Sequence, residues 1–230
     1  MPSDPSSLAA LSDPPPGGGD SSGAPAARRR RKDARPSELL AAALELFAEK
    51  GFAATRLDDV ARRAGVSKGT LYLYFDSKEA LFKAVIEQGI VPTLTAAEQQ
   101  VAEHTGPVCD LLRALLYGWW RQIGETPLSG VPKLIVAEAS NFPALARYYH
   151  DEVIMRGRAL VRAALERGIA QGEFRALDIE STIDVALAPL LMLVMWRHSF
   201  CDCGRSIDPE TYLATHYELM LRGLTLTQEK

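Results

Sequence analysis

The sequence predicts an all-α protein with a small three-helix N-terminal domain and a larger domain of about six helices. Apolar residues recur at three- and four-residue spacing from Pro36 almost to the C-terminus, which is the period of an amphipathic helix. No segment shows the strict alternation of a half-buried strand, and no internal repeat is present. Glycine, proline, serine or aspartate residues separate the apolar stretches, as they do at helix ends.

The first 35 residues differ in composition from the rest of the chain. Proline, glycine and serine are frequent up to residue 27, and the basic run Arg28–Lys32 follows directly. Such a segment cannot bury enough apolar surface to fold alone. We therefore expect residues 1–35 to be a disordered tail with a basic arm.

Short helices with recognisable ends are predicted between residues 36 and 78. Gly51 is expected to end the first helix with a left-handed cap. The hydroxyl of Thr55 is expected to cap the second helix, with Asp58 as the acidic partner of a capping box. The expected boundaries are Pro36–Lys50, Thr55–Ala64, Ser67–Phe75 and a fourth helix starting near Lys78 behind Asp76 and Ser77.

The second and third of these helices have the pattern of a helix-turn-helix. Gly65 supplies left-handed backbone at the turn, and Val66 fills the angle between the helices. Leu71 and Phe75 are expected to face inward. The third helix opens with small, polar or cationic residues, which let a backbone approach DNA closely while side chains reach bases or phosphates. The alternative is a helical hairpin without a partner.

Charge is unevenly distributed along the chain. Residues 28–78 contain 12 Lys or Arg against 7 Asp or Glu, whereas residues 79–230 contain 14 against 19. A basic module joined to an acidic one indicates a polyanionic partner for the basic part. The basic run Arg28–Lys32 is expected to follow phosphates or enter the minor groove, with a solubilising tail as the alternative.

The segment from Phe47 to Leu81 resembles the tetracycline-repressor (TetR/AcrR) family. The stretches FAEKGFAAT, VARRAGVSKGTLYLYF and SKEAL carry this continuous resemblance. It implies a helix-turn-helix DNA-binding domain at residues 36–80 and an effector-binding and dimerisation domain at residues 81–230. The resemblance also implies repression, which rests on the family's habit alone, since no residue of the sequence distinguishes a repressor from an activator.

The resemblance implies a set of DNA-contacting residues. Tyr72 and Tyr74, which lie two residues apart and point to different faces, are expected to contact the backbone and bases. Lys78 is expected to anchor a phosphate. Arg56 departs from the Ser or Thr common at its position, and could reach a phosphate with a full charge. The complete set is Arg56, Ser67, Lys68, Gly69, Thr70, Tyr72, Tyr74 and Lys78.

Later helices are rich in aromatic and methionine residues. Pro92 should kink or end the fourth helix, and further helices are expected at 107–125, 131–140, 143–171, 178–200 and 208–226. Soft, wide side chains also line promiscuous apolar pockets, although ordinary core packing is the alternative for each one. A pocket for a small apolar or aromatic effector is expected to use Trp119, Trp120, Tyr148, Tyr149 and Trp196.

The last two helices are expected to pair with those of a second copy as a four-helix bundle. Such a homodimer would recognise a palindromic operator in double-stranded DNA. The apolar run 185–196 is too short to span a bilayer and is expected to be a buried helix, so no membrane partner is predicted. An architectural or cell-cycle DNA-binding protein without a small ligand is the alternative function.

The sequence gives no sign of catalysis, a cofactor or a metal. It contains no Ser-His-acid grouping, phosphate-binding glycine loop or paired carboxylates in an apolar setting. His198, Cys201 and Cys203 lie close together but fit no common zinc spacing, so metal or thiol sensing is the lesser alternative to incidental residues. With three cysteines and no apolar signal segment, a reducing, cytoplasmic location is expected.

Overall fold

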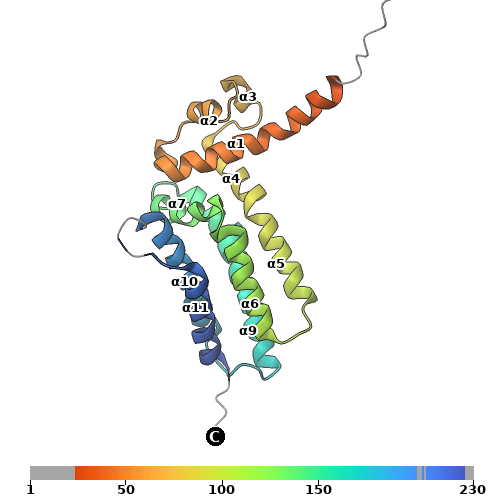
Figure 1. The fold of residues 1–230 in the computed structure, drawn as a ribbon, viewed down its shortest axis with the longest axis vertical. Helices are drawn as coiled ribbons and strands as arrows, with labels where there is room; N and C mark the ends of the chain where they lie inside the picture. The colour runs from red at the N-terminus through yellow and green to blue at the C-terminus, as the bar shows by residue number, and fades with distance from the viewer. Residues whose placement is uncertain (1–23, 201–203, 205, 226–230) are drawn as a thin grey trace, which may run out of the picture. The chain divides into compact units, whose positions relative to one another are not determined.

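The computed structural model describes residues 24–200, 204 and 206–225, with side chains from Pro36 onward. The described residues divide into two units, with the boundary between residues 35 and 36. Within the described residues the chain is helical apart from turns and one isolated bridge between Phe174 and Thr225. The predicted all-α class is confirmed (Figure 1).

Helix α1 spans Ala24–Ala54 and starts twelve residues before the predicted position at Pro36. The expectation of a helix start at Pro36 is therefore wrong. Alanine and arginine have high helix propensity, and residues 24–35 contain four Ala and five Arg. Gly51 has the predicted positive φ of 80°, but its ψ of 168° makes a kink, after which a last turn continues to Ala54.

Helices α2 (Leu57–Arg63) and α3 (Lys68–Tyr72) form the helix-turn-helix. Gly65 lies between them with φ of 67°, and Val66 is half-buried against the core, as predicted. Helix α3 ends at Tyr72 rather than near Phe75. The guanidinium of Arg63 donates to Glu45 and Glu49 of α1, which ties α2 to α1.

The predicted capping role of Thr55 is wrong. Arg56 occupies the N-cap position of α2 and makes no side-chain capping bond. The Thr55 side chain is buried, and its hydroxyl donates to the carbonyls of Leu46 (3.2 Å) and Gly51 (2.7 Å). These carbonyls lie near the end of α1, where the helix leaves acceptors without intrahelical partners.

Helix α4 (Lys78–Gly89) begins behind Ser77, whose side chain accepts from the amide of Ala80. Helix α5 (Val91–Glu103) follows almost directly, with Pro92 in its first turn. The prediction that α4 kinks or ends near Pro92 is confirmed, but α5 was not predicted. A proline in the first turn starts a helix, because the missing N–H has no intrahelical acceptor there.

The next elements run without long loops. Helix α6 (Val108–Trp119) continues through the π-helical segment η1 (Trp120–Gly124), and the 3-10 turn η2 (Pro127–Ser129) leads into α7 (Gly130–Glu138). Helix α8 (Pro143–Tyr149), the π-helical segment η3 (His150–Ile154) and α9 (Met155–Ala170) form the long predicted helix, which Gly172 closes with φ of 75°.

Helix α9 is the central element of the C-terminal domain and packs against α5, α6 and α10. Arginines fasten it to its neighbours. Arg156 pairs with Glu98 of α5 at 2.7 Å, and Arg158 and Arg162 both pair with Glu180 of α10. Arg167 donates to carbonyls at the end of α5.

Helices α10 (Ile179–Ser199) and α11 (Pro209–Leu224) lie side by side (Figure 1). Both helices begin where the sequence predicts, and the side chains of Asp178 and Asp208 cap them. The expectation that the apolar run of α10 is buried is not met within a single chain, where only 22% of its most apolar window is buried. By length and composition alone, α10 could cross a membrane, a test that core helices of soluble proteins also pass.

The core extends from the helix-turn-helix into the C-terminal domain. Near α1 and α4, the rings of Phe47, Phe52 and Phe82 pack with centroids 5.4–5.6 Å apart. A second cluster lies between α6, α10 and α11 and consists of Leu116, Trp120, Leu190, Leu193, Val194 and Leu213. On its α10 side, this cluster adjoins exposed apolar residues of the same helix.

Candidate functional site

The N-terminal end of α3 presents polar side chains to solvent, and the opposite side of the helix is buried. Ser67 caps α3 by accepting from the Thr70 amide at 3.1 Å, and the two hydroxyls lie 2.8 Å apart. Ser67, Lys68 and Gly69 are exposed, while Leu71 is fully buried. The structure thus places the predicted residues from Ser67 to Thr70 together on one accessible helix end.

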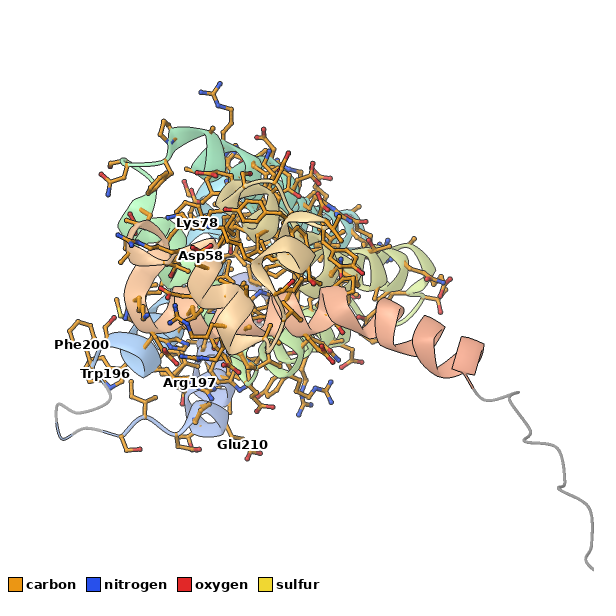
Figure 2. The ribbon with its side chains drawn as sticks, turned by 90° about the horizontal axis from the view of Figure 1, so that it is seen from above. Asp58, Lys78, Trp196, Arg197, Phe200 and Glu210 are labelled. Atoms are coloured by element: carbon orange, nitrogen blue, oxygen red, sulfur yellow. The ribbon has the colours of Figure 1, made fainter. Side chains whose placement is uncertain are left out.

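Lys68 is paired within the helix-turn-helix. Its ammonium donates to the Asp58 carboxylate of α2 at 2.9 Å and lies 5.7 Å from the Tyr72 ring centroid. The bond to Asp58 raises the pKa of Lys68, so its positive charge is secure. The ion pair of Lys68 and Asp58 (labelled in Figure 2) is exposed. A phosphate can therefore compete with Asp58 for the ammonium of Lys68.

The residues after Lys68 differ in their exposure. Tyr72 is 46% exposed, as a DNA contact requires, whereas Tyr74 is half-buried against the core. Leu73 is 83% exposed and was missed by the sequence prediction. Its position two residues after buried Leu71, outside the apolar stripe, is the signal that could have identified it.

Arg56 and Lys78 have different surroundings. Arg56 is exposed in extended backbone before α2. Lys78 is half-buried, and its ammonium donates to the carbonyls of Phe52 (2.6 Å) and Ala53 (3.0 Å). Burial lowers the pKa of Lys78. An ammonium has three N–H donors, and two of those of Lys78 are committed to the end of α1.

The five predicted effector aromatics lie in different places. Trp120 and Trp196 line one cavity, and Trp119 lies beside Trp120 with ring centroids 6.5 Å apart. The Tyr148 hydroxyl donates to Glu87 of α4 at 2.9 Å, and burial together with this bond raises the pKa of Tyr148. Tyr149 is 7% exposed within the main core, where burial raises its pKa. The two tyrosines are not among the residues lining that cavity.

The cavity at Trp120 and Trp196 measures about 250 Å³. Trp196 packs against Phe200 with ring centroids 5.4 Å apart. Figure 2 labels both residues at the end of α10. Arg197 adds a cation to the lining, and its guanidinium donates to the Gly124 carbonyl. The full lining is Trp120, Leu193, Trp196, Arg197, Ser206, Ile207 and Pro209.

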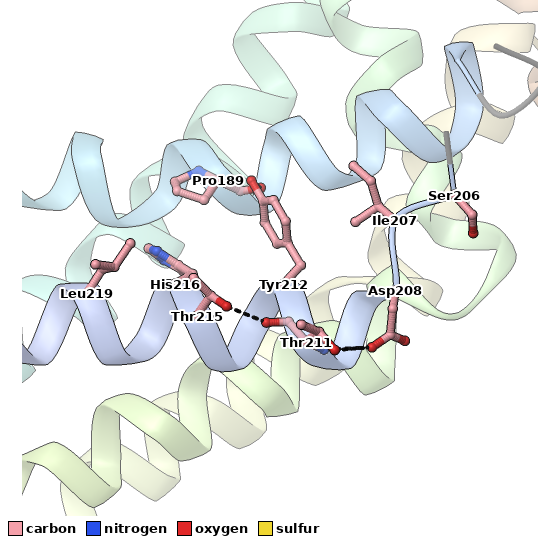
Figure 3. A pocket seen from close by; sticks show the side chains of 9 residues that line it. All are labelled: Pro189, Ser206, Ile207, Asp208, Thr211, Tyr212, Thr215, His216 and Leu219. Atoms are coloured by element: carbon pink, nitrogen blue, oxygen red, sulfur yellow. Dashed lines mark hydrogen bonds between the residues drawn. The ribbon is translucent and has the colours of Figure 1, made fainter. Parts of the chain in front are cut away.

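A larger hollow of about 450 Å³ lies between α10 and α11. Tyr212 and His216 of α11 point toward Pro189 of α10, as Figure 3 shows. The Tyr212 hydroxyl donates to the Pro189 carbonyl at 3.2 Å, and burial lowers the pKa of His216. Leu219, which is 65% exposed, lines the same hollow. This hollow belongs to the exposed face of the α10–α11 pair.

The described part of the chain contains no cluster of His, Cys, Asp or Glu that could hold a metal ion. Cys201 and Cys203, considered above as sensing residues, lie outside the described residues. His198 is half-buried and contacts the Ser129 hydroxyl at 2.8 Å, and burial lowers its pKa.

The fold and the exposed end of α3 define a helix-turn-helix DNA-binding transcription regulator. Residues 39–85 match the family model of bacterial regulatory proteins of the tetR family, and residues 102–202 match a tetracyclin repressor-like C-terminal domain. The chain is 32% identical over 155 residues to the HTH-type transcriptional regulator YfiR of Bacillus subtilis, covering 66% of this chain and 74% of YfiR. The chain belongs to the tetR family.

Two further comparisons agree with this assignment. The HTH-type transcriptional repressor KstR2 of Rhodococcus jostii is 28% identical over 195 residues, which cover 84% of this chain and 92% of that repressor. The solved structure of the ketosteroid transcriptional regulator KstR2 of Mycobacterium tuberculosis is 25% identical, with a TM-score of 0.67 and coverage of 84% and 96%. The likeness thus extends through both domains.

Proposed function

We propose that this protein is a homodimeric cytoplasmic repressor that binds a palindromic operator and is released by a small, mostly apolar effector. The observation that carries the proposal is the exposed end of α3, where Ser67, Lys68 and Tyr72 are accessible above buried Leu71. Small and cationic residues at this position suit an approach to base edges and phosphates in the major groove. The repressor KstR2, which aligns over both domains, supports repression.

A second copy of the chain is the partner proposed for the α10–α11 face. This face combines exposed Val185 and Met192 of α10 with exposed Leu219 of α11. Two-fold pairing through it would present α3 twice, as a two-fold symmetric operator requires.

The effector is proposed to enter the cavity lined by Trp120 and Trp196. Indole rings with Leu193 and Ile207 offer an apolar surface, and Arg197 offers one cation for a polar end group. The ketosteroid regulator with a similar structure supports a hydrophobic effector such as a steroid. The DNA-binding protein without a small ligand stays the alternative, favoured if no apolar compound releases DNA.

The DNA-binding half is tested with a duplex that the wild-type protein selects from a random-sequence library. The double variant Lys68→Ala with Tyr72→Ala should lose at least about 100-fold in affinity for that duplex, since both side chains are exposed at the end of α3 that is proposed to contact DNA. Light scattering should show an unchanged dimer. Unchanged affinity of the double variant for the selected duplex would refute the role assigned to α3.

The effector half is tested on the same protein–DNA complex. Progesterone, a ketosteroid, should release the duplex and quench tryptophan fluorescence, because the proposed cavity contains two indoles. Trp196→Ala should weaken both effects while leaving DNA affinity without ligand unchanged. Failure of steroid and fatty-acid probes alike to release DNA would favour the ligand-free alternative.

A further inference from the structure

The last turn of α1, residues 51–54, leads into α2 and is held by the C-terminal domain. Gly51 starts this turn with its positive φ, and Ala53 lies in its middle. The Ala53 amide donates to the Glu138 carboxylate at 3.0 Å, across 85 residues of sequence. Glu138 is the last residue of α7, and its other oxygen accepts from the Asn141 side chain at 3.1 Å.

Lys78, the first residue of α4, binds the same turn from another side. Its ammonium donates to the carbonyls of Phe52 and Ala53 and lies 4.5 Å from the Phe52 ring centroid. The Ala53 amide, the Asn141 amide and the Lys78 charge all lower the pKa of Glu138. The turn is therefore bound through its N–H by an anion and through its carbonyls by a cation.

Apolar contact adds to these polar bonds. Phe52 is fully buried, and its ring meets that of Phe142 edge-on with centroids 4.7 Å apart. Phe142 precedes α8, four residues after Glu138. Helices α7, α8 and α4 thus meet at one turn of the DNA-binding domain.

This turn determines where the helix-turn-helix begins. Helix α2 starts at Leu57, and Thr55 is bonded back to Gly51 and Leu46. Little free chain therefore separates the Glu138 contact from α2, and α3 packs on α2. A displacement of the turn must be passed on to α3.

We propose that Glu138 is a positioning residue for DNA recognition, whose carboxylate acts with the Lys78 ammonium to fix the turn from which α2 and α3 extend. Helix α7 is also attached to the end of α10, where Lys133 donates to the His198 carbonyl at 2.6 Å. One short helix thus connects the DNA-binding domain with the helix next to the proposed effector cavity. The inference rests on the proposed DNA-binding function.

Because Glu138 is an anion, the direction in which its removal changes DNA affinity distinguishes an electrostatic effect from a positioning effect. Removing an anion from a DNA-binding protein strengthens its attraction to the polyanion if electrostatics alone decides. Loss of a positioning contact has the opposite effect on specific binding, because α3 then samples more orientations. Glu138→Gln separates the contributions, since the amide oxygen can still accept from Ala53 although the charge is gone.

The first experiment compares Glu138→Ala and Glu138→Gln with the wild type on the selected duplex and on an unrelated duplex. Glu138→Ala should bind the selected duplex about tenfold more weakly, the scale of one lost charge-assisted hydrogen bond. Glu138→Gln should remain within about threefold of the wild type. The control Glu166→Ala removes the same charge from an exposed site on α9 and should cause no loss.

The second experiment follows hydrogen exchange in the free protein, which does not depend on DNA. The Ala53 amide should exchange faster in Glu138→Ala, together with the amides of α2, while the amides of α9 stay unchanged. Equal or tighter operator binding by Glu138→Ala, or unaltered exchange at Ala53, would overturn the inference. A wild-type protein that selects no duplex would instead refute the proposed function. The exchange experiment would still test the contact between Glu138 and Ala53.

Discussion

Leu73 is the most exposed large apolar side chain among the described residues, and it directly follows Tyr72 at the end of α3. An exposed leucine is common on protein surfaces, but this one lies beside the side chains proposed to contact DNA. In the major groove, only thymine offers a methyl group for apolar contact. Leu73 is therefore suited to favour A·T pairs at one position of each half-site.

Leu73→Ala should lower affinity for the selected duplex by about fivefold, corresponding to about 1 kcal/mol, and reduce the preference for thymine at one position. The free energy of unfolding should change by less than about 0.5 kcal/mol, because the side chain is not packed. Fluorescence anisotropy with substituted duplexes and urea unfolding measure the two effects. Val136→Ala, a truncation of another exposed residue on α7, is the control; equal base preferences in Leu73→Ala and wild type would contradict the prediction.

Residue roles were predictable where they depend on neighbours in the sequence. The starts at Ser67, Ser77, Asp178 and Asp208 follow from local capping chemistry, and all four side chains accept the expected amide. Thr55 has the same chemistry but bonds to carbonyls of α1, and Lys78 does likewise. Their partners depend on how α1 ends and how α4 crosses it, which a local pattern does not contain.

At the scale of elements, helix periodicity predicted most segments but neither of the π-helical ones. Segments η1 and η3 widen the helical turn without changing its apolar content. Helix α5 was missed because Pro92 was taken as a helix end rather than a helix start. The sequence also could not predict that the turn after α9 places the Phe174 ring against Gly168, because this contact depends on tertiary packing.

Gly168 and Gly157 provide a matched pair on α9. A Cβ on Gly168 would lie 2.1 Å from the Phe174 ring, which is buried, whereas a Cβ on Gly157 meets nothing within 4 Å. Gly168→Ala should destabilise the protein by about 1–3 kcal/mol through overpacking. Gly157→Ala should stabilise it by up to about 1 kcal/mol, because alanine has the higher helix propensity.

Urea unfolding of the two variants measures both free energies on the same helix. The prediction requires shifts of opposite sign with a common dependence on urea, so that the difference reflects stability alone. Shifts of the same sign would show that the Phe174 ring moves aside without cost, or that residue 157 packs more closely than the structure indicates.

At the scale of the whole molecule, the apolar surface of α10 and α11 needs an explanation. Val185, Met192 and Leu219 expose 71%, 53% and 65% of their surfaces, and α10 is mostly unburied over its apolar window. Soluble monomers rarely keep large contiguous apolar patches in water. The sequence predicted dimerisation through these helices, yet it also predicted burial of α10, and both expectations are compatible only if a second copy covers the face.

The double variant Val185→Lys with Leu219→Lys should be monomeric at micromolar concentration, because two desolvated lysines on each subunit oppose the two-fold contact. Operator affinity should fall at least about 100-fold, since the second half-site is then no longer bound intramolecularly. Sedimentation equilibrium measures the mass. The control Val136→Lys, which places a lysine at an exposed position of α7, should leave a dimer. A variant that stays dimeric would place the subunit contact elsewhere, and wild-type protein that is monomeric but sediments with lipid vesicles would assign the apolar face of α10 to a membrane instead.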